Sequence, residues 1–164
     1  MSLCWVFIVT FIVFPAAFFK AGFSFDQGHG NDPTTEKQLD ATYVNLIFNL
    51  MDTIGRWMGG KYVLSSRTTI GLSILRTVFI FTTLACAVFA EPAWLFQSDW
   101  FRVTNQILFA FTNGYVSTMC MVLAPQTVQD SEAQNSAGLF GSIFLCLGIT
   151  FGSIINIPVG EIYK

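Results

Sequence analysis

Charged residues are scarce in this chain. They make up 11% of its 164 residues, whereas hydrophobic residues make up 53%. A soluble domain carries roughly a quarter charged residues, because its surface has to be solvated. The eight Lys and Arg residues form no basic stripe that could follow a phosphate backbone, so we expect no nucleic-acid partner. This scarcity of charge excludes an ordinary soluble fold and points to a lipid bilayer as the surroundings.

Long stretches of the chain are almost free of charge. Five windows contain at most two charged residues each: 1–19, 41–59, 68–90, 103–129 and 133–160. A helix needs roughly 20 apolar residues to cross about 30 Å of hydrocarbon. The windows also lack the charged face of an amphipathic helix in a soluble protein. We therefore predict an all-α, polytopic membrane protein of five transmembrane helices, forming one domain over residues 1–164.

The ends of the predicted spans follow from prolines, polar links and interfacial tryptophans. The spans are expected at about 3–19, 41–59, 68–89, 100–123 and 136–157, with a polar loop at 20–40. The first span could instead be the core of a signal peptide, but the positively charged segment that such a peptide needs is missing. Lys and Arg are divided too evenly between the two sides to give an orientation.

Residues that catalyse reactions or bind metals are few. The four cysteines (Cys4, Cys86, Cys120 and Cys146) lie in predicted spans without a CxxC pair, so we interpret them as small buried side chains. The single histidine, His29, lies in the polar loop. No Ser/His/Asp set and no pair of carboxylates within a span is present. We therefore expect no enzyme, no metal site and no cofactor.

The second predicted span carries a line of polar residues, which we call the polar stripe: Asn45, Asn49, Asp52 and Arg56. Their spacing of i, i+4, i+7 and i+11 places them on one side of a helix. Asp and Arg at the centre of a membrane helix each cost roughly 2.5–3.5 kcal/mol on insertion scales. Asp52 and Arg56 can meet because they are four residues apart. We favour a functional site over a purely structural salt bridge.

The other predicted spans also contain polar residues and glycines that need an interpretation. Gln106, Asn113 and Ser117 repeat the helical spacing in the fourth span and serve either a site or hydrogen bonds between helices. Arg76 in the third span either pairs with a buried acid or reaches the interface with its head group, and we favour the second. Glycines such as Gly148 in the fifth span are expected to allow close helix packing.

Several short motifs follow one another in a specific order. They are Phe14-Pro15-Ala16, FNLMDTIGR at 48–56, FAFTNGY at 109–115, Met119-Cys120-Met121 and LCLG at 145–148. The ordered set resembles the seventh, eighth, tenth and eleventh transmembrane helices of the equilibrative nucleoside transporter family, over nearly the whole chain. One departure is Phe81, which stands where the family pattern has a proline five residues after Arg76.

The resemblance implies the architecture around these spans. The chain would be the C-terminal half of an eleven-helix transporter, one bundle of a major-facilitator-like fold. Its partners would be the lipid bilayer and an N-terminal bundle of about six helices that this sequence does not contain. Residues 20–40 and 90–99 would be extracellular, and residues 60–67 and 124–135 cytoplasmic. We expect a multi-pass protein of the plasma membrane rather than of an intracellular membrane.

The resemblance also implies a site and an activity. Asp52 and Arg56 match family residues associated with the nucleoside's sugar and with conformational switching. The leading hypothesis is therefore transport of nucleosides or nucleobases by alternating access, with this chain as part of the transporter. Asp52 and Arg56 would bind substrate, Asn49 would orient them, and Asn113 and Gln106 would be second-rank residues of the cavity. The alternative is a non-transporting membrane fragment or a regulatory or assembly subunit.

Overall fold

All regular secondary structure in the described part of the chain is helical. A computed structural model describes residues 2–14, 33–88, 98–126 and 131–162. Its helices are α1 (Ser2–Val13), α3 (Pro33–Lys61), α4 (Ser66–Leu75), α5 (Val78–Val88), α6 (Asp99–Gln126) and α7 (Ser131–Ile162). No strand occurs in these ranges. The all-α class expected from the sequence is confirmed.

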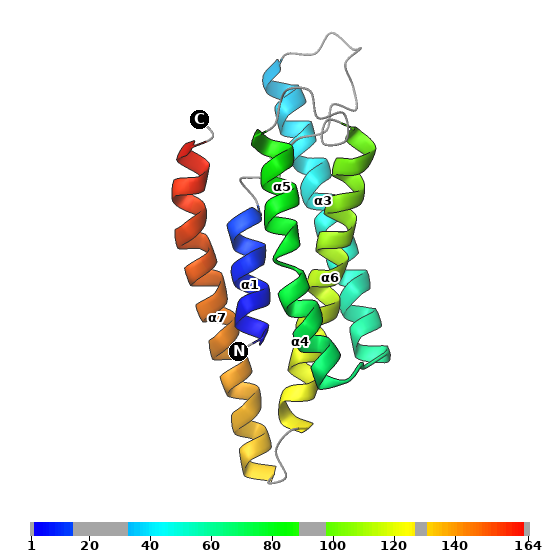
Figure 1. Ribbon diagram of the computed structural model, residues 1–164, viewed down its shortest axis with the longest axis vertical. Helices are drawn as coiled ribbons and strands as arrows, with labels where there is room; N and C mark the ends of the chain where they lie inside the picture. Colours follow the sequence, from blue (N-terminus) through cyan, green and yellow to red (C-terminus); the bar gives the residue numbers. More distant parts are fainter. Residues whose placement is uncertain (1, 15–32, 89–97, 127–130, 163–164) are drawn as a thin grey trace.

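The helices alternate in direction along one long axis (Figure 1). In that view α1, α4, α5 and α7 ascend, whereas α3 and α6 descend. The most extensive contacts join α3 to α6 and α1 to α7, while α4 and α5 contact α6 and α1 between these two pairs. Segments far apart in the sequence are therefore side by side, with the first helix beside the last (Figure 1).

Three segments of the described chain are long and apolar enough to cross a membrane. They are Ser66–Cys86, Trp100–Gln126 and Ser136–Pro158. The helix Ser2–Val13 is apolar but shorter, and residues 15–19 of the first predicted span lie outside the described residues. The second predicted span, 41–59, forms the later part of α3. A membrane-embedded helical bundle is thus supported by three spans, and the other two of the five stay predictions.

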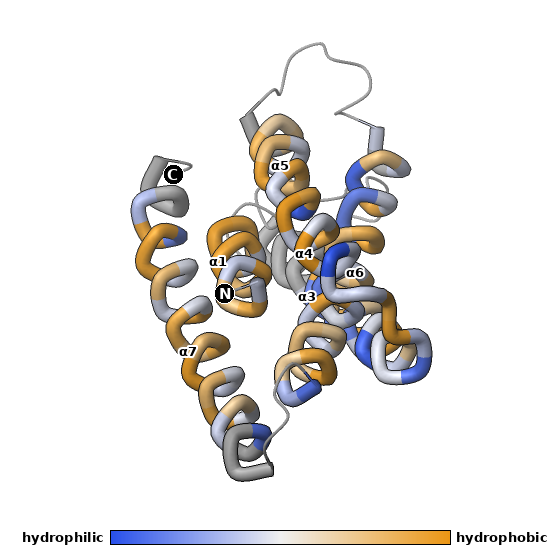
Figure 2. The backbone as a smooth tube through the Cα atoms, turned by 60° about the horizontal axis from the view of Figure 1, so that its bottom comes forward, coloured by the Kyte–Doolittle hydropathy of each residue, from blue (hydrophilic) through white to orange (hydrophobic). Residues whose placement is uncertain are grey.

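The outer surface of the bundle is rich in large apolar side chains. On α7 these include Leu139, Phe140, Ile143, Ile154 and Ile157, all exposed. Figure 2 shows hydrophobic residues dominating α1 and the middle part of α7. An apolar exterior of this extent is unfavourable in water and favourable in hydrocarbon. It agrees with the lipid surroundings inferred from composition.

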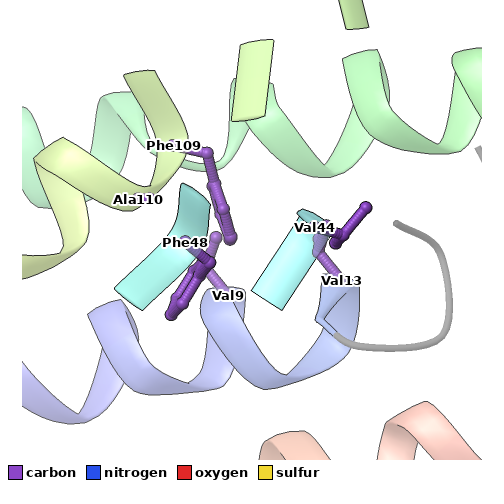
Figure 3. Close-up of a cluster of buried hydrophobic side chains, with 6 residues drawn as sticks. All are labelled: Val9, Val13, Val44, Phe48, Phe109 and Ala110. Atoms are coloured by element: carbon purple, nitrogen blue, oxygen red, sulfur yellow. The ribbon is translucent and has the colours of Figure 1, made fainter. Parts of the chain in front are cut away.

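The core lies where α1, α3 and α6 meet (Figure 3). Its buried residues are Val9 and Val13 of α1, Val44 and Phe48 of α3, and Phe109 and Ala110 of α6. The rings of Phe48 and Phe109 are tilted, with their centroids 6.1 Å apart. This interdigitation of three helices fixes the distance of α3 from α6, and that distance decides whether their polar side chains can meet.

Glycines bring the helix backbones into contact. A Cβ on Gly114 of α6 would overlap the carbonyl oxygen of Asp52, and a Cβ on Gly55 of α3 would overlap that of Phe111. Across the α1–α7 contact, a Cβ on Gly148 would come within 2.7 Å of the Cys4 carbonyl oxygen. Glycines therefore allow the close approach of the two helices in each pair, as expected for membrane helices.

The third predicted span is broken into two helices. α4 ends at Leu75, and α5 begins at Val78. Around the break, Thr77 N–H donates to Ile74 O at 3.0 Å and Phe79 N–H donates to Arg76 O at 3.0 Å. These bonds reach three residues back instead of four, which tightens the chain into a turn of 3₁₀ type. The span predicted at 68–89 therefore contains a turn at residues 76–77 that the sequence prediction did not include.

Candidate functional site

The C-terminal part of α3 presents different side chains in different directions. The polar stripe lies on its exposed surface, where Asn45, Asn49 and Arg56 are exposed and Asp52 is partly buried. Beside it runs a second exposed line, which we call the apolar stripe: Tyr43, Leu46, Leu50, Ile54 and Trp57. The remaining side of the helix packs on α6. The polar stripe therefore borders the packed face on one side and the apolar stripe on the other.

Both carboxylate oxygens of Asp52 accept a short hydrogen bond. Arg56 Nε donates to Oδ2 at 2.7 Å, and Asn113 Nδ2 donates to Oδ1 at 2.7 Å. One donor comes from the same helix and the other from α6, so the carboxylate is held between two elements. Each oxygen keeps a further lone pair that can accept from a ligand. The ion pair expected from the i, i+4 spacing is present.

Arg56 lies at the open side of this arrangement. Its side chain is 44% exposed, against 13% for that of Asp52. Only its Nε bonds to Asp52, and among the described residues its two Nη groups have no other partner. A guanidinium carries five N–H donors in a planar fork, so four of them remain for a ligand or for water.

Arg76 lies in the interior instead of at an interface. Its side chain is 1% exposed. Its Nη1 donates to Phe109 O at 3.0 Å and to Thr112 Oγ1 at 2.7 Å, and its Nη2 donates to Asn113 Oδ1 at 3.2 Å. Among the described residues no carboxylate contacts it. The expectation that Arg76 reaches the interface is therefore wrong, because its guanidinium bonds to Phe109 and Asn113 of α6 in the interior.

Thr10 of α1 completes the buried connection. Its hydroxyl accepts from Arg76 Nη2 at 3.0 Å and donates to Asn113 Oδ1 at 2.6 Å. A continuous path of hydrogen bonds thus runs from Arg76 and Thr10 through Asn113 to Asp52 and Arg56. We call these five residues the polar network. It joins α1, the α4–α5 break, α6 and α3 in the middle of the bundle.

The remaining two candidate residues lie apart from the Asp52–Arg56 pair. The Asn49 amide donates to Asn45 O at 2.8 Å, within its own helix, so Asn113 and not Asn49 contacts Asp52. Gln106 is fully buried, where its Nε2 donates to Val44 O at 2.6 Å and its Oε1 has no partner in the described chain. Asn49 therefore lies on the open surface, whereas Gln106 joins α6 to α3 in the interior.

Comparison with known proteins assigns the chain to a family. The profile of the family described as "Nucleoside transporter" matches residues 1–158. The chain belongs to the nucleoside transporter family. The expectation of family membership from the ordered motifs is confirmed, and the family is one of transporters rather than of enzymes.

Curated relatives within the nucleoside transporter family resemble almost the whole chain. Equilibrative nucleoside transporter 1 of Rattus norvegicus is 32% identical over 95% of this chain. Equilibrative nucleoside transporter 1 of Homo sapiens is 29% identical over 94% of it, and equilibrative nucleoside transporter 2 of Homo sapiens is 30% identical over 95%. In each case the chain spans only 34% of the relative's own length.

Two members of the polar network were not foreseen as site residues. Arg76 was visible in the sequence as the only charge in its span, but its contacts depend on the break between α4 and α5 in which it lies. Thr10 gave no signal, because a threonine in an uncharged span is common and its partners lie 66 and 103 residues away. The bonds of Arg76 and Thr10 to Asn113 are visible only once the helices of this family member are packed together.

Cysteine and histidine play no part in the described site of this nucleoside transporter family member. All four cysteines are free, and Cys86 alone among them is buried. The described residues contain no group of three His, Cys, Asp or Glu side chains that could hold a metal ion. His29 lies outside the described residues.

Proposed function

We propose that this chain is part of a membrane transporter for nucleosides or nucleobases that works by alternating access. Asp52 and Arg56 bind the substrate in this proposal. Asn113 holds Asp52, Asn49 lines the open surface, and Gln106 supports the contact of α3 with α6. The proposal includes the plasma membrane as the location, an N-terminal bundle of about six helices as the partner, and transport without catalysis.

One observation carries the proposal: a carboxylate fixed at both oxygens lies beside a guanidinium with unused donors on a partly exposed surface. A carboxylate accepts hydrogen bonds from the hydroxyls of a sugar. A guanidinium donates to oxygens of a sugar or a base and restrains the carboxylate beside it. The relatives are named as equilibrative nucleoside transporters, which supports a substrate with these groups.

The test compares Asp52→Ala with Ile54→Ala in the complete protein, expressed from its own gene in cells that lack nucleoside uptake. A hydrogen bond to a charged group contributes about 1.5–3 kcal/mol, which is roughly a 10- to 150-fold change in affinity. We expect Asp52→Ala to raise the KM for uridine on this scale or to abolish uptake. Ile54 lies on the apolar stripe two residues away, so its variant should transport like the parent. Unchanged uptake by Asp52→Ala would reject the assignment.

The alternative function is a non-transporting fragment or a regulatory subunit. The observation that favours it is the limited coverage, since the chain spans 34% of the length of its relatives. A pathway between two helical bundles needs both of them. The chain alone, reconstituted in liposomes, discriminates between the two functions. Saturable uridine flux would exclude an inert fragment, whereas flux only after addition of a partner bundle would fit the proposed transporter.

A further inference from the structure

The side-chain amide of Asn113 is held at both ends by groups of opposite hydrogen-bonding character. Its Nδ2 donates to Asp52 Oδ1 at 2.7 Å. Its Oδ1 accepts from Thr10 Oγ1 at 2.6 Å and from Arg76 Nη2 at 3.2 Å. Asn113 is 2% exposed, so water cannot easily replace any of these partners.

These partners allow only one orientation of the amide. A carboxylate accepts hydrogen bonds and cannot donate them, whereas a guanidinium donates and cannot accept. Rotation of the amide by half a turn would place its oxygen against the carboxylate of Asp52 and its NH₂ group against the N–H groups of Arg76. Both contacts would be repulsive. Arg76 therefore reinforces the orientation in which the Asn113 NH₂ group faces Asp52, although Arg76 does not touch Asp52 itself.

Arg76 is itself fixed by contacts that do not involve Asn113. Its Nη1 bonds to Phe109 O and to Thr112 Oγ1, and its guanidinium carbon lies 4.9 Å from the centre of the Phe109 ring. Thr77, beside it in the break, accepts a bond from Trp5 Nε1 at 3.2 Å. The guanidinium is thus anchored to α6 by two further bonds, and its neighbour in the break is tied to α1.

We propose that Arg76, together with Thr10, is a positioning residue that sets the sugar selectivity of the site through Asn113. Without Arg76 the Asn113 oxygen loses its charged donor, so the flipped amide is opposed by Asp52 alone and the Nδ2 group is held less firmly against Asp52 Oδ1. A carboxylate that can rotate discriminates less between a ribose hydroxyl and its absence. This inference rests on the proposed function, because it requires that Asp52 accepts hydrogen bonds from the sugar of the substrate.

The test measures how well the complete protein distinguishes uridine from 2′-deoxyuridine and 3′-deoxyuridine. The readout is the ratio of the KM for each deoxynucleoside to the KM for uridine, obtained from uptake rates. Arg76→Met removes the donors and keeps an extended side chain, and we expect its ratio to fall to about one. Thr10→Val, which keeps the side-chain volume, should lower the ratio in part. Arg76→Lys should keep part of the parental KM ratio, and Thr10→Ser should keep all of it.

A matched control separates positioning from general loss of structure. Asn105, also a buried amide of α6, accepts from Thr82 Oγ1 at 2.9 Å and donates to Thr83 Oγ1 at 3.0 Å, away from Asp52. Asn105→Leu should lower the amount of folded protein and leave the KM ratio at the parental value. A parental ratio in Arg76→Met would overturn the inference, and so would an equal loss of ratio in Asn105→Leu; a parental ratio in Thr10→Val alone would remove Thr10 from it.

Failure of the proposed function has a different signature. If the parent protein takes up uridine and both deoxynucleosides with equal KM, or if Asp52→Asn keeps the parental ratio, Asp52 does not bind the sugar. The proposed function is then rejected, and the inference falls with it. If Asp52→Asn loses the ratio but Arg76→Met keeps it, only the role of Arg76 is rejected.

Discussion

Asp52 is a partly buried carboxylate in a helix that the sequence analysis predicts to span the membrane. Its neighbours determine whether a charge is tolerated at this position. An isolated acid at the centre of a membrane helix costs roughly 2.5–3.5 kcal/mol on insertion scales. Asp52 has a cation on one oxygen and a buried amide on the other, each at 2.7 Å. Charge-assisted bonds of this length are the strong ones. The cost of Asp52 is therefore offset inside this chain, before any substrate binds.

The geometry of Arg56 predicts that a positive charge alone is insufficient at this position for substrate binding. Lys has one ammonium group, so a lysine that pairs with Asp52 offers no planar fork beyond it. We expect Arg56→Lys in the complete protein to raise the KM for uridine roughly 10-fold or more, as for the loss of a bond to a charged group. Uptake kinetics measure this. The reverse exchange at the exposed end of α3, Lys61→Arg, should leave the KM unchanged. A parental KM in Arg56→Lys would show that charge is sufficient.

The sequence predicted local contacts of the site and missed distant ones. The Asp52–Arg56 pair follows from a separation of four residues in a helix, which needs no knowledge of tertiary structure. The bond from Asn113 to Asp52 depends on how closely α6 approaches α3, and the bonds of Arg76 depend on a break between two helices. Neither quantity is encoded in helical periodicity, so Asn113 appeared as a second-rank residue and Arg76 as an interfacial one.

At the scale of elements, the contact of α3 with α6 depends on Gly114. A methyl group there would overlap Asp52 O and lie 2.8 Å from Arg56 N. Because these are backbone atoms, relief requires movement of a whole helix. We expect Gly114→Ala to destabilise the protein by about 1–3 kcal/mol, as overpacking generally does. Thermal unfolding of purified protein in detergent measures the change.

The control for Gly114 is a glycine with open space. Apart from the adjoining backbone of its own helix, no atom of the described chain lies within 4 Å of a Cβ built on Gly71 in α4. Gly71→Ala should leave stability unchanged or raise it by up to about 1 kcal/mol, because Ala is the better helix former. Equal stability of Gly114→Ala and Gly71→Ala would mean that α3 and α6 are further apart than described.

The break between α4 and α5 predicts where proline is tolerated. Phe81 is the fourth residue of α5, and the carbonyl of Thr77, which a helical Phe81 N–H would reach, already accepts from Ile80 N–H at 3.1 Å. Proline at position 81 therefore leaves the Thr77 carbonyl with its hydrogen bond from Ile80. Ala85 lies one turn further on, where proline costs about 3 kcal/mol or more. We expect the unfolding temperature of Phe81→Pro to be close to that of the parent protein and the unfolding temperature of Ala85→Pro to be well below it. Equal losses would contradict the assigned break.

The elements themselves were predictable to different degrees. Windows with at most two charges indicated apolar helices, and three described segments have the length and composition of membrane spans. The break at Arg76 was not foreseen, because residues 72–88 contain neither proline nor glycine. The signal that remained was the charge itself. An arginine in an apolar span needs partners, and a tightened turn is one way for it to reach them.

At the scale of the whole molecule, the exposed surface of α3 is divided between two kinds of residue. The polar stripe would be unfavourable against lipid, since unpaired polar groups in hydrocarbon cost several kcal/mol. The apolar stripe beside it is suited to hydrocarbon or to another apolar helix. A bundle with such a surface is stable in a membrane when water or further protein covers the polar stripe. The chain spans 34% of the length of its relatives, and in them further protein is available for this cover.

This division predicts which positions water reaches in the complete protein. Asn49 and Leu50 are adjacent and both exposed, but Asn49 lies on the polar stripe and Leu50 on the apolar stripe. In a background with the four cysteines replaced, Asn49→Cys should react with a membrane-impermeant thiol reagent and Leu50→Cys should not, because only the thiolate in contact with water is nucleophilic. Excess uridine should slow the reaction at position 49. Reaction at position 50 alone would mean that the apolar stripe, and not the polar stripe, faces the aqueous path. Equal reaction at both positions, unaffected by uridine, would mean that α3 lines no substrate path.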